Sequence, residues 1–237
     1  MKLSLGPVLL GCVLAGCASN ADDDASAAGS ALGADAYGAY ADFARANGLD
    51  PDASRGATVI GLRGVSFEGE AHATTFAHAF DDTLVVLGSD KRVLRFHAST
   101  HPFQNAAPGV PDVDGDGAVD VGMIRPGVYD ASARSALVAG QPSWAVSHDG
   151  SGKLPGWRDT NHDGMLDDDE IAAAEERGDT LTDVLFHQGE GGAPPAVGCQ
   201  VLPASAMRAF VSAVGAHASF RYVLVDMTGR DASALPR

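Results

Sequence analysis

The sequence predicts a mainly β domain with a few helices, an α+β fold built on a β-sandwich or a mixed sheet. Three observations lead to this fold class. Short apolar runs bounded by glycine, proline and aspartate recur along most of the chain, which is typical of strands and turns. Only a few segments place apolar residues at helical spacing. The 237 residues are enough for one domain with a sizeable core.

The chain starts with a segment typical of bacterial secretion. Residues 1–16 combine the positive Lys2 with an apolar run that is too short to span a bilayer, which needs about 20 apolar residues. The motif LAGC at residues 14–17 resembles the bacterial lipobox, which implies that Cys17 carries a lipid and becomes the first mature residue. The alternative is an ordinary signal peptide without lipid. We therefore expect a lipoprotein of the bacterial cell envelope, held at the membrane by its lipid anchor.

Processing at Cys17 bears on both the sorting of the protein and its cysteine count. Because alanine rather than aspartate follows Cys17, the resemblance implies the outer membrane, at its periplasmic face or at the cell surface. Cys12 leaves with the signal and Cys17 takes the lipid, so Cys199 remains alone and no disulfide can form within the mature chain. A lone cysteine in an oxidising compartment is either a reactive thiol or a small buried hydrophobe.

The charge balance argues against two classes of partner. The sequence has 31 acidic side chains against 16 lysines and arginines, a formal net charge of −15. Such a chain repels nucleic acids and anionic membrane surfaces, so no nucleic-acid partner is expected. Much of the acidity lies in two aspartate-rich clusters, which favours bound cations instead.

Four regions follow one another along the chain. The tether that follows the signal is small, polar and acidic, and is therefore expected to be flexible. Beyond it, apolar residues at helical spacing predict a helix over 35–47, with Asp35 as N-cap and Gly48 as stop. The regions are the signal at 1–16, the lipidated tether at 17–34, an N-terminal helix and linker at 35–57, and the main domain at 58–237.

The main domain is interpreted as a series of strands separated by turn residues. Each expected strand is a short run rich in β-branched, aliphatic or aromatic residues. After Pro203 an amphipathic helix is expected, with Met207, Phe210 and Val214 on one face. Strands are expected at 58–64, at 83–99 as a hairpin with its turn at 88–91, at 119–124, at 143–148, at 182–188 and at 219–227, with a further turn at 126–127.

One acidic segment, DTNHDGMLDDDE at residues 159–170, matches the EF-hand calcium loop at every ligand position. Leu166 is expected to pack inward, and residues 170–176 to continue as the exiting helix. The expected ligands are Asp159, Asn161, Asp163, the carbonyl of Met165, Asp167 and the bidentate Glu170. Because Pro155 and Gly156 precede the loop in place of an entering helix, we interpret it as a structural calcium staple rather than a switch. The alternative is an acidic turn without an ion.

A second acidic segment, at residues 112–123, matches the same pattern in part. Met123 stands where the last glutamate is expected, and no helix follows. A second calcium site and a solvated acidic turn are equal alternatives here. The matching side chains are Asp112, Asp114, Asp116 and Asp120. Structural calcium is the expected cofactor, and no organic cofactor is expected.

The chemistry of the chain depends on residues 185–203, LFHQGEGGAPPAVGCQVLP. A strand-borne His-Gln-Gly at 187–189 is followed by a glycine-rich loop and then by Gly198-Cys199 ahead of a helix. This order resembles the L,D-transpeptidase catalytic domain, and it is most similar to a bacterial and phage subgroup with a Gly-Cys-Gln motif. Five further segments follow in the order of that subgroup: IGLRG at 60–64, FDDTLVVL at 80–87, FHASTHP at 96–102, IRPGVY at 124–129 and WRDTNHDG at 157–164.

The resemblance implies a Cys-His mechanism that acts on the stem peptide of peptidoglycan. Cys199 is then the nucleophile, His187 the base that takes its proton, and Gly198 the residue that lets backbone amides face a developing oxyanion. Val197 replaces the family's second histidine and Val201 its following Arg or Asn, so the acyl acceptor, an amine or water, stays open. Candidate substrate-binding residues are Gln188, Arg63 and His101; for Arg63 and His101 a plain surface position is the alternative.

Two functions are carried forward. The first is an envelope-anchored cysteine enzyme that acts on peptidoglycan as an L,D-transpeptidase, carboxypeptidase or endopeptidase. The second is a non-catalytic, calcium-binding structural or adhesive lipoprotein in which Cys199 is merely buried. The enzyme needs the Cys199 sulfur within hydrogen-bond reach of the His187 ring in an open cleft, allowing for looser geometry without substrate. A buried sulfur that points away from His187 favours the second function.

Replacing Cys17 by alanine is expected to release the protein from membranes or to block its processing, because the lipid attachment site is lost. Partitioning into the detergent phase measures this effect, with Cys12→Ala as the control. Unchanged partitioning of Cys17→Ala would disprove lipid attachment at this residue.

Overall fold

A computed structural model describes residues 30–33, 35–53, 56–73, 79–101, 109–189, 198–230 and 235–236 of the chain. The expected signal, Cys17 and most of the expected tether lie outside these residues. The described part is mainly β with three α-helices, which confirms the predicted α+β class. None of its helices is long and apolar enough to cross a membrane.

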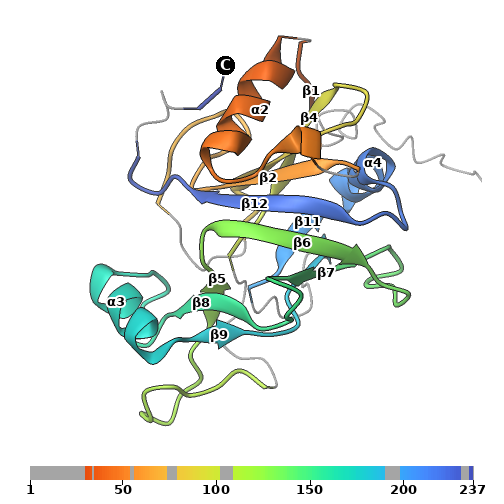
Figure 1. Ribbon diagram of the computed structural model, residues 1–237. Helices are drawn as coiled ribbons and strands as arrows, with labels where there is room; N and C mark the ends of the chain where they lie inside the picture. Colours follow the sequence, from red (N-terminus) through yellow and green to blue (C-terminus); the bar gives the residue numbers. More distant parts are fainter. Residues whose placement is uncertain are drawn as a thin grey trace, which may run out of the picture.

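Nine strands form one mixed sheet, in the order β1-β4-β3-β2-β12-β6-β7-β10-β11 (Figure 1). Neighbouring strands are antiparallel except for two parallel pairs, β2 with β12 and β10 with β11. The strands therefore belong to one continuous sheet rather than to two stacked sheets. Their bounds are β1 Ser30–Ala31, β2 Thr58–Arg63, β3 Asp82–Leu87, β4 Val93–Ala98, β6 Gly127–Ala133, β7 Trp144–Ser147, β10 Leu185–Gly189, β11 Gln200–Pro203 and β12 Phe220–Asp226.

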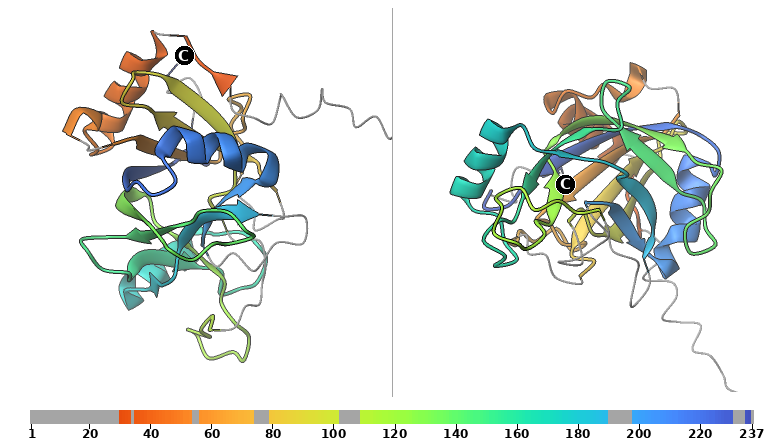
Figure 2. Two further views of the ribbon diagram at one scale, coloured as in Figure 1. Left: turned by 90° about the vertical axis from the view of Figure 1, so that its right-hand side faces the viewer. Right: turned by 90° about the horizontal axis from the view of Figure 1, so that it is seen from below.

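The sheet curls until its last strand meets β4 (Figure 2). Ser99, directly after β4, donates from its N–H to the carbonyl of Val201 at 2.8 Å and accepts from the Val201 N–H at 2.9 Å. This mutual pair joins β4 to β11, which makes the sheet nearly a closed barrel. Backbone donors and acceptors that would face solvent at an open edge are satisfied at this point.

Two apolar cores lie on opposite faces of the sheet. The first is covered by α4 (Ala204–Val214) and contains Phe186, Phe210 and Tyr222. The second is covered by α2 (Ala36–Ala46) and also takes side chains from β2, β3 and β12. Because these three strands contribute to both cores, their sequences are nearly continuous apolar runs instead of alternating ones.

The first core is built around aromatic rings. Phe210 packs edge-on against Phe96 and Trp144, with ring centroids 5.7 Å apart in each pair. Tyr222 lies inside the curled sheet and donates its hydroxyl proton to Oε1 of Gln200 at 2.6 Å. A Cβ at Gly61 would collide with the Tyr222 ring. The glycine therefore makes room for a hydrogen bond that fixes the strand immediately after Cys199.

A smaller, three-stranded sheet carries the 159–170 loop. It consists of β5 (Gly122–Ile124), β8 (Leu154–Arg158) and β9 (Thr180–Leu181), in the order β5-β8-β9. The helix α3 (Asp168–Arg177) follows the loop and packs beside β8 (Figure 1). No helix enters the loop, as expected from Pro155 and Gly156; the strand β8 that enters it instead was not predicted.

Four details differ from the sequence-based predictions. Asp35 occupies the N-cap position of α2, as predicted, but it has helical backbone angles and makes no side-chain capping bond. Strand β6 begins within the turn expected at 126–127, and β8 contains Pro155 and Gly156. The end of the expected tether is not loose, because β1 pairs with β4 and Leu32 packs against the second core.

Candidate active site

Cys199 and His187 lie on neighbouring parallel strands of the curled sheet. The register of β10 and β11 pairs Phe186 with Gln200 and His187 with Val201, so Cys199 lies just before the paired stretch. Phe186 faces the first core, and alternation along the strand therefore turns His187 to the opposite face. Cys199 and Val201 pack on that same face with Phe80 and Leu185.

Hydrogen bonding fixes the tautomer of His187. Its Nδ1 lies 2.7 Å from the carbonyl oxygen of Gln188, and a carbonyl can only accept, so Nδ1 carries the proton. The side chain is 3% exposed. Burial lowers the pKa of His187 more than the Gln188 hydrogen bond raises it, which keeps the ring neutral at neutral pH. Nε2 then holds a lone pair and can accept a proton.

The Cys199 sulfur is held by backbone groups of the neighbouring turn and strand. The N–H of Leu185 donates to Sγ at 3.4 Å, and the thiol lies 3.9 Å from the carbonyl oxygen of Asp183. The residue is 6% exposed. The described hydrogen bonds of Sγ thus run to the backbone and not to the His187 ring. An N–H that donates to sulfur stabilises a thiolate over a thiol.

Gly198 has a backbone conformation that only glycine adopts without strain, with φ +80°. A Cβ there would also collide with Leu181 and approach the carbonyl oxygen of Gly122 to 3.2 Å. The turn before Cys199 therefore rests directly on the start of β5. This confirms the need for glycine that the sequence predicted at this position, while the oxyanion role remains a prediction.

Segment 99–101 adds a histidine–carboxylate pair beside β11. His101 is fully buried, and its Nε2 lies 2.8 Å from Oδ1 of Asp81. Burial raises the pKa of Asp81, but the hydrogen bond and charge of His101, with smaller contributions from the backbone and His72, together lower it overall. The alternative of a surface position for His101 is therefore wrong.

Arg63 is fully buried as well, so the alternative of a surface position is wrong for this residue too. Its guanidinium donates to Oγ1 and O of Thr100 at 3.2 and 2.8 Å and to O of Ile124 at 3.0 Å. Asp82 accepts from the N–H and the hydroxyl of Thr100 at 2.8 and 2.7 Å. These bonds engage Arg63 within the protein, so it positions segment 99–101, and its contact with a substrate remains a prediction.

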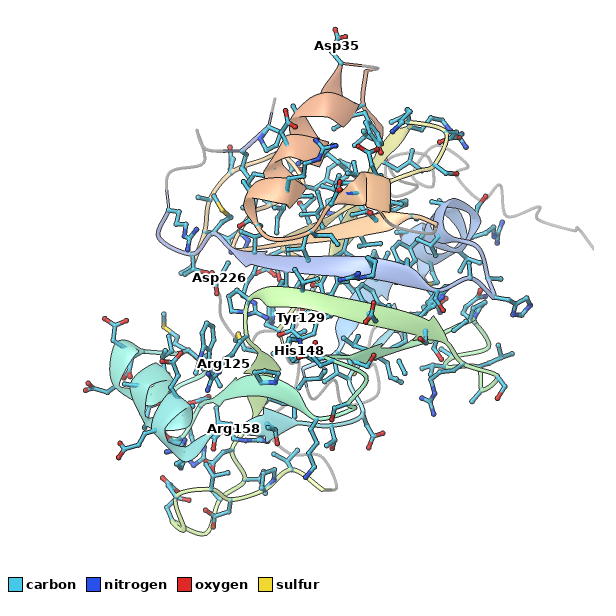
Figure 3. All side chains as sticks on the ribbon, viewed as in Figure 1. Asp35, Arg125, Tyr129, His148, Arg158 and Asp226 are labelled. Carbon is cyan, nitrogen blue, oxygen red and sulfur yellow. The ribbon has the colours of Figure 1, made fainter. Side chains whose placement is uncertain are left out.

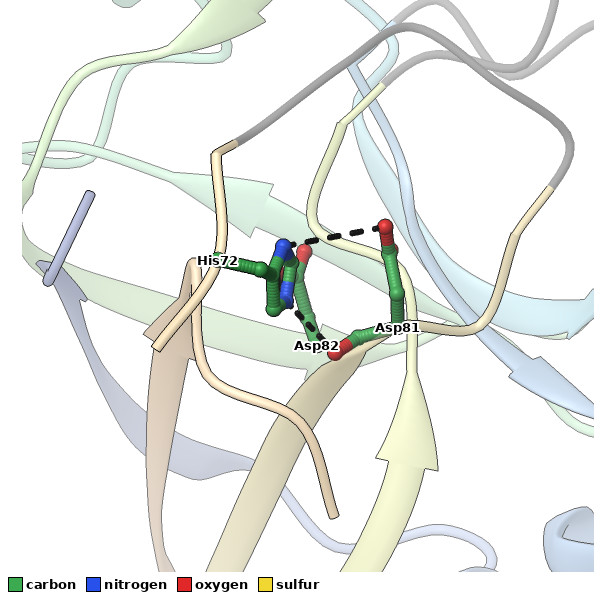
Figure 4. A group of neighbouring side chains, drawn as sticks. All are labelled: His72, Asp81 and Asp82. Carbon is green, nitrogen blue, oxygen red and sulfur yellow. Dashed lines mark hydrogen bonds and ion pairs between the residues drawn. The ribbon is translucent and has the colours of Figure 1, made fainter. Parts of the chain in front are cut away.

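A cluster of His72, Asp81 and Asp82 has the composition of a metal site (Figure 4). Both ring nitrogens of His72 lie 2.8 Å from backbone carbonyl oxygens, those of Ala73 and Asp81, so both must donate. Burial opposes this charge, but the two backbone bonds and the carboxylates raise the pKa of His72 overall. A doubly protonated ring has no lone pair for a metal, and the cluster is a structural ion-pair network.

The 159–170 loop folds as the EF-hand spacing requires. Asp159 accepts from the Gly164 N–H at 3.0 Å, and Glu170 accepts from the N–H groups of Thr160 and Asn161 at 2.7 and 3.0 Å. Glu170 also forms a capping box with Asp167 at the start of α3. Leu166 packs against Val121, Met123 and Trp157, which confirms its predicted inward position.

One buried oxygen of this loop is consistent with the calcium ion that the sequence predicts, and calcium binding itself remains a prediction. Oδ1 of Asp159 is buried and has no hydrogen-bond partner among the described residues. Burial, together with Glu170 and Asp163, raises the pKa of Asp159, because its negative charge is poorly compensated. Oxygen ligands at this spacing are what calcium prefers, and the ion would supply the missing positive charge. The exposed Asn161, Asp163 and Met165 complete the predicted ligand set.

Sequence reasoning missed the groups that hold the site in place. The bonds from Leu185 N–H and Gln188 carbonyl are made by the backbone, so no residue type signals them. The Asp81–His101 pair joins residues 20 positions apart, and the Arg63–Thr100 bonds join residues 37 positions apart. Only the unusual polar residues at the ends of apolar strands point to these networks in the sequence.

Comparison of the chain with protein-family models, with curated proteins and with solved structures found no match.

Added calcium is expected to raise the melting temperature of the protein. At ten times the dissociation constant, an ion that binds only the folded state contributes about 1.4 kcal/mol of stability, which raises Tm by about 3 to 6 °C in a domain of this size. Glu170→Gln should blunt the shift, because a charged ligand is lost, whereas Glu176→Gln on the exposed side of α3 should leave it intact. A wild-type melting curve that calcium does not move contradicts the staple interpretation.

Proposed function

We propose that the chain is an envelope-anchored cysteine enzyme that acts on peptidoglycan stem peptides, as an L,D-transpeptidase or as the corresponding carboxypeptidase or endopeptidase. The observation that supports this proposal best is the state of His187. Its Nδ1–H is committed to the Gln188 carbonyl, its Nε2 can accept a proton, and it shares a sheet face with Cys199 two positions away on the neighbouring strand. A shared face and a base with a free acceptor nitrogen support the pairing of nucleophile and base, while the described hydrogen bonds of Sγ run to the backbone.

The proposed reaction uses these atoms in two steps. Sγ of Cys199 attacks the carbonyl carbon of a peptide bond next to a D-centre while Nε2 of His187 takes the thiol proton. The C–N bond then breaks and Nε2 returns the proton to the leaving amine. In the second step an amine or water attacks the thioester, gives up a proton to Nε2, and releases the thiol. Backbone N–H groups near Gly198 would stabilise the oxyanion in both steps.

Burial of His187 determines how the thiol is activated. A buried imidazole avoids the charged form, so a stable thiolate–imidazolium pair is disfavoured before substrate binds. His187 then acts as a general base during the attack. The N–H of Leu185 stabilises the charge that develops on sulfur before the new bond has formed.

A structural lipoprotein is the second candidate function. Cys199 is 6% exposed, and its described hydrogen bonds run to backbone groups of Asp183 and Leu185. In this alternative Cys199 is a core residue, and calcium stabilises a domain without catalytic activity. The resemblance in the order of segments favours the enzyme, whereas the burial of the sulfur favours the structural role.

Iodoacetamide is expected to label the native, lipidated protein at Cys199 at neutral pH. His187→Ala should slow labelling by about a hundredfold, the lower end of what a positioned general base contributes, because the group that takes the thiol proton during the attack is lost. His217→Ala, at an exposed histidine, is the matched control and should have no effect. Labelling that occurs only after denaturation would contradict a catalytic role and leave the structural one.

Incubation with purified muropeptides tests the substrate. The wild-type protein should convert stem peptides to shortened or cross-linked products that mass spectrometry resolves, and Cys199→Ala should lose at least about a hundredfold in rate, because the nucleophile is absent. The variant should keep its melting temperature within a few degrees. Lost stability with no turnover in either protein supports the structural lipoprotein.

A further inference from the structure

The Asp112–Asp120 segment ends in a carboxylate that is buried without compensation. Asp120 is fully buried, and its Oδ1 has no hydrogen-bond partner among the residues that the structure describes. Burying a carboxylate oxygen without a partner costs free energy, and a positive charge beside it would reduce that cost.

The unpartnered oxygen of Asp120 is directed toward the other acidic side chains. Nε2 of His162 lies 3.7 Å from this Oδ1 and 3.3 Å from Oδ2 of Asp116, so both carboxylates face the same point. Ligand oxygens of Asp112, Asp114 and Asp116 lie within 4.8 Å of one another. A single cation can therefore reach these three side chains, and the His162 nitrogen that approaches Asp116 also approaches the buried Asp120.

The segment has the same internal hydrogen bonds as the 159–170 loop, position by position. The first carboxylate of each loop accepts from the glycine five residues later, Asp112 from Gly117 at 2.9 Å and Asp159 from Gly164 at 3.0 Å. The N–H at the second position donates to the closing carboxylate, which is Glu170 in one loop and Asp120 in the other. Asp120 thus accepts the hydrogen bond that Glu170 accepts in the other loop, whereas Met123 stands where the EF-hand pattern expects a glutamate.

The two loops are also joined to each other. They lie at the ends of the paired strands β5 and β8, where the Asp159 N–H donates to the carbonyl of Val121 at 2.9 Å. Arg158, labelled in Figure 3, donates from the end of β8 to the carbonyl oxygens of Asp120 and Thr180, each at 2.8 Å. His162 then reaches from the second loop to the carboxylates of the first.

We propose that the Asp112–Asp120 loop binds a second calcium ion, with Asp120 as its closing ligand, so that the protein holds two calcium ions side by side. The ligand oxygens come from Asp112, Asp114, Asp116 and Asp120, with the carbonyl of Ala118 at the seventh position and water to complete the six to eight ligands that calcium takes. Magnesium, which requires a near-ideal octahedron of short bonds, is the poorer fit to a loop that supplies this many protein oxygens.

Equilibrium dialysis of the complete mature chain against calcium chloride measures the number of ions bound. Two ions are expected for the wild-type protein, one for Asp120→Asn and one for Glu170→Gln, and none for the double variant. Asp149→Asn, at a carboxylate whose side chain is 92% exposed, is the matched control and should keep two. The same dialysis against magnesium chloride should give fewer ions at equal concentration.

Because Asp120 is buried, Asp120→Asn could lose calcium through misfolding. Asp112→Asn, which removes a charge at an exposed position of the same loop, controls for this. It should also reduce the number of bound ions to one, with an unchanged far-ultraviolet circular dichroism spectrum. A wild-type stoichiometry below two overturns the proposal, as does the survival of two ions in both Asp120→Asn and Asp112→Asn. These outcomes are independent of the muropeptide assay, so the second calcium site and the enzymatic function fail separately.

Discussion

The mutual hydrogen bonds between Ser99 and Val201 are the constraint on which the candidate site depends. They join β4 to β11 and turn a strand that would otherwise be an edge into an internal one. Closure brings segment 99–101 beside the strand that Cys199 precedes. Arg63 and Asp82 bind Thr100 from inside the sheet, so the middle of this segment is fixed. The lone cysteine therefore starts a strand with a neighbour on each side.

The depth of the site limits the chemistry it can perform. A histidine that is 3% exposed and neutral is a poor partner for a permanent thiolate, but it is a suitable base at the moment when charge develops. The Gln188 carbonyl contributes orientation, because it leaves only Nε2 to accept the proton. Rigid strands and a fixed tautomer reduce the entropy lost when the His187 ring is oriented. Burial raises the free energy of protonating that ring.

Local patterns predicted more of this structure than long-range ones could. Helices α2, α3 and α4 and the β3–β4 hairpin follow from spacing and turn residues within one segment, and the 159–170 loop follows from a fixed ligand spacing. Strand β8 was not predicted, because Pro155 and Gly156 normally interrupt strands. The strand is possible because Gly156 has no side chain, and Leu181 fills the space where its Cβ would lie. Pro155, which pairs with β9, also lies where no backbone N–H is needed. The buried positions of Arg63 and His101 depend on sheet closure, which no local pattern encodes.

The two acidic loops, 112–120 and 159–170, are connected to Cys199 through strand β5. Gly198 packs against the backbone of Gly122 and Met123, the first residues of β5, and β5 begins two residues after Asp120. The poorly compensated carboxylates of Asp120 and Asp159 repel their acidic neighbours at the same end of the β5–β8 pair, where β5 begins and β8 ends. Cations in the loops would remove this repulsion and hold the strand against which the turn before Cys199 rests. If the proposed ions bind, part of the large negative charge of the chain would serve to hold the cations that stabilise this strand, and the position of Gly198 would then depend on calcium.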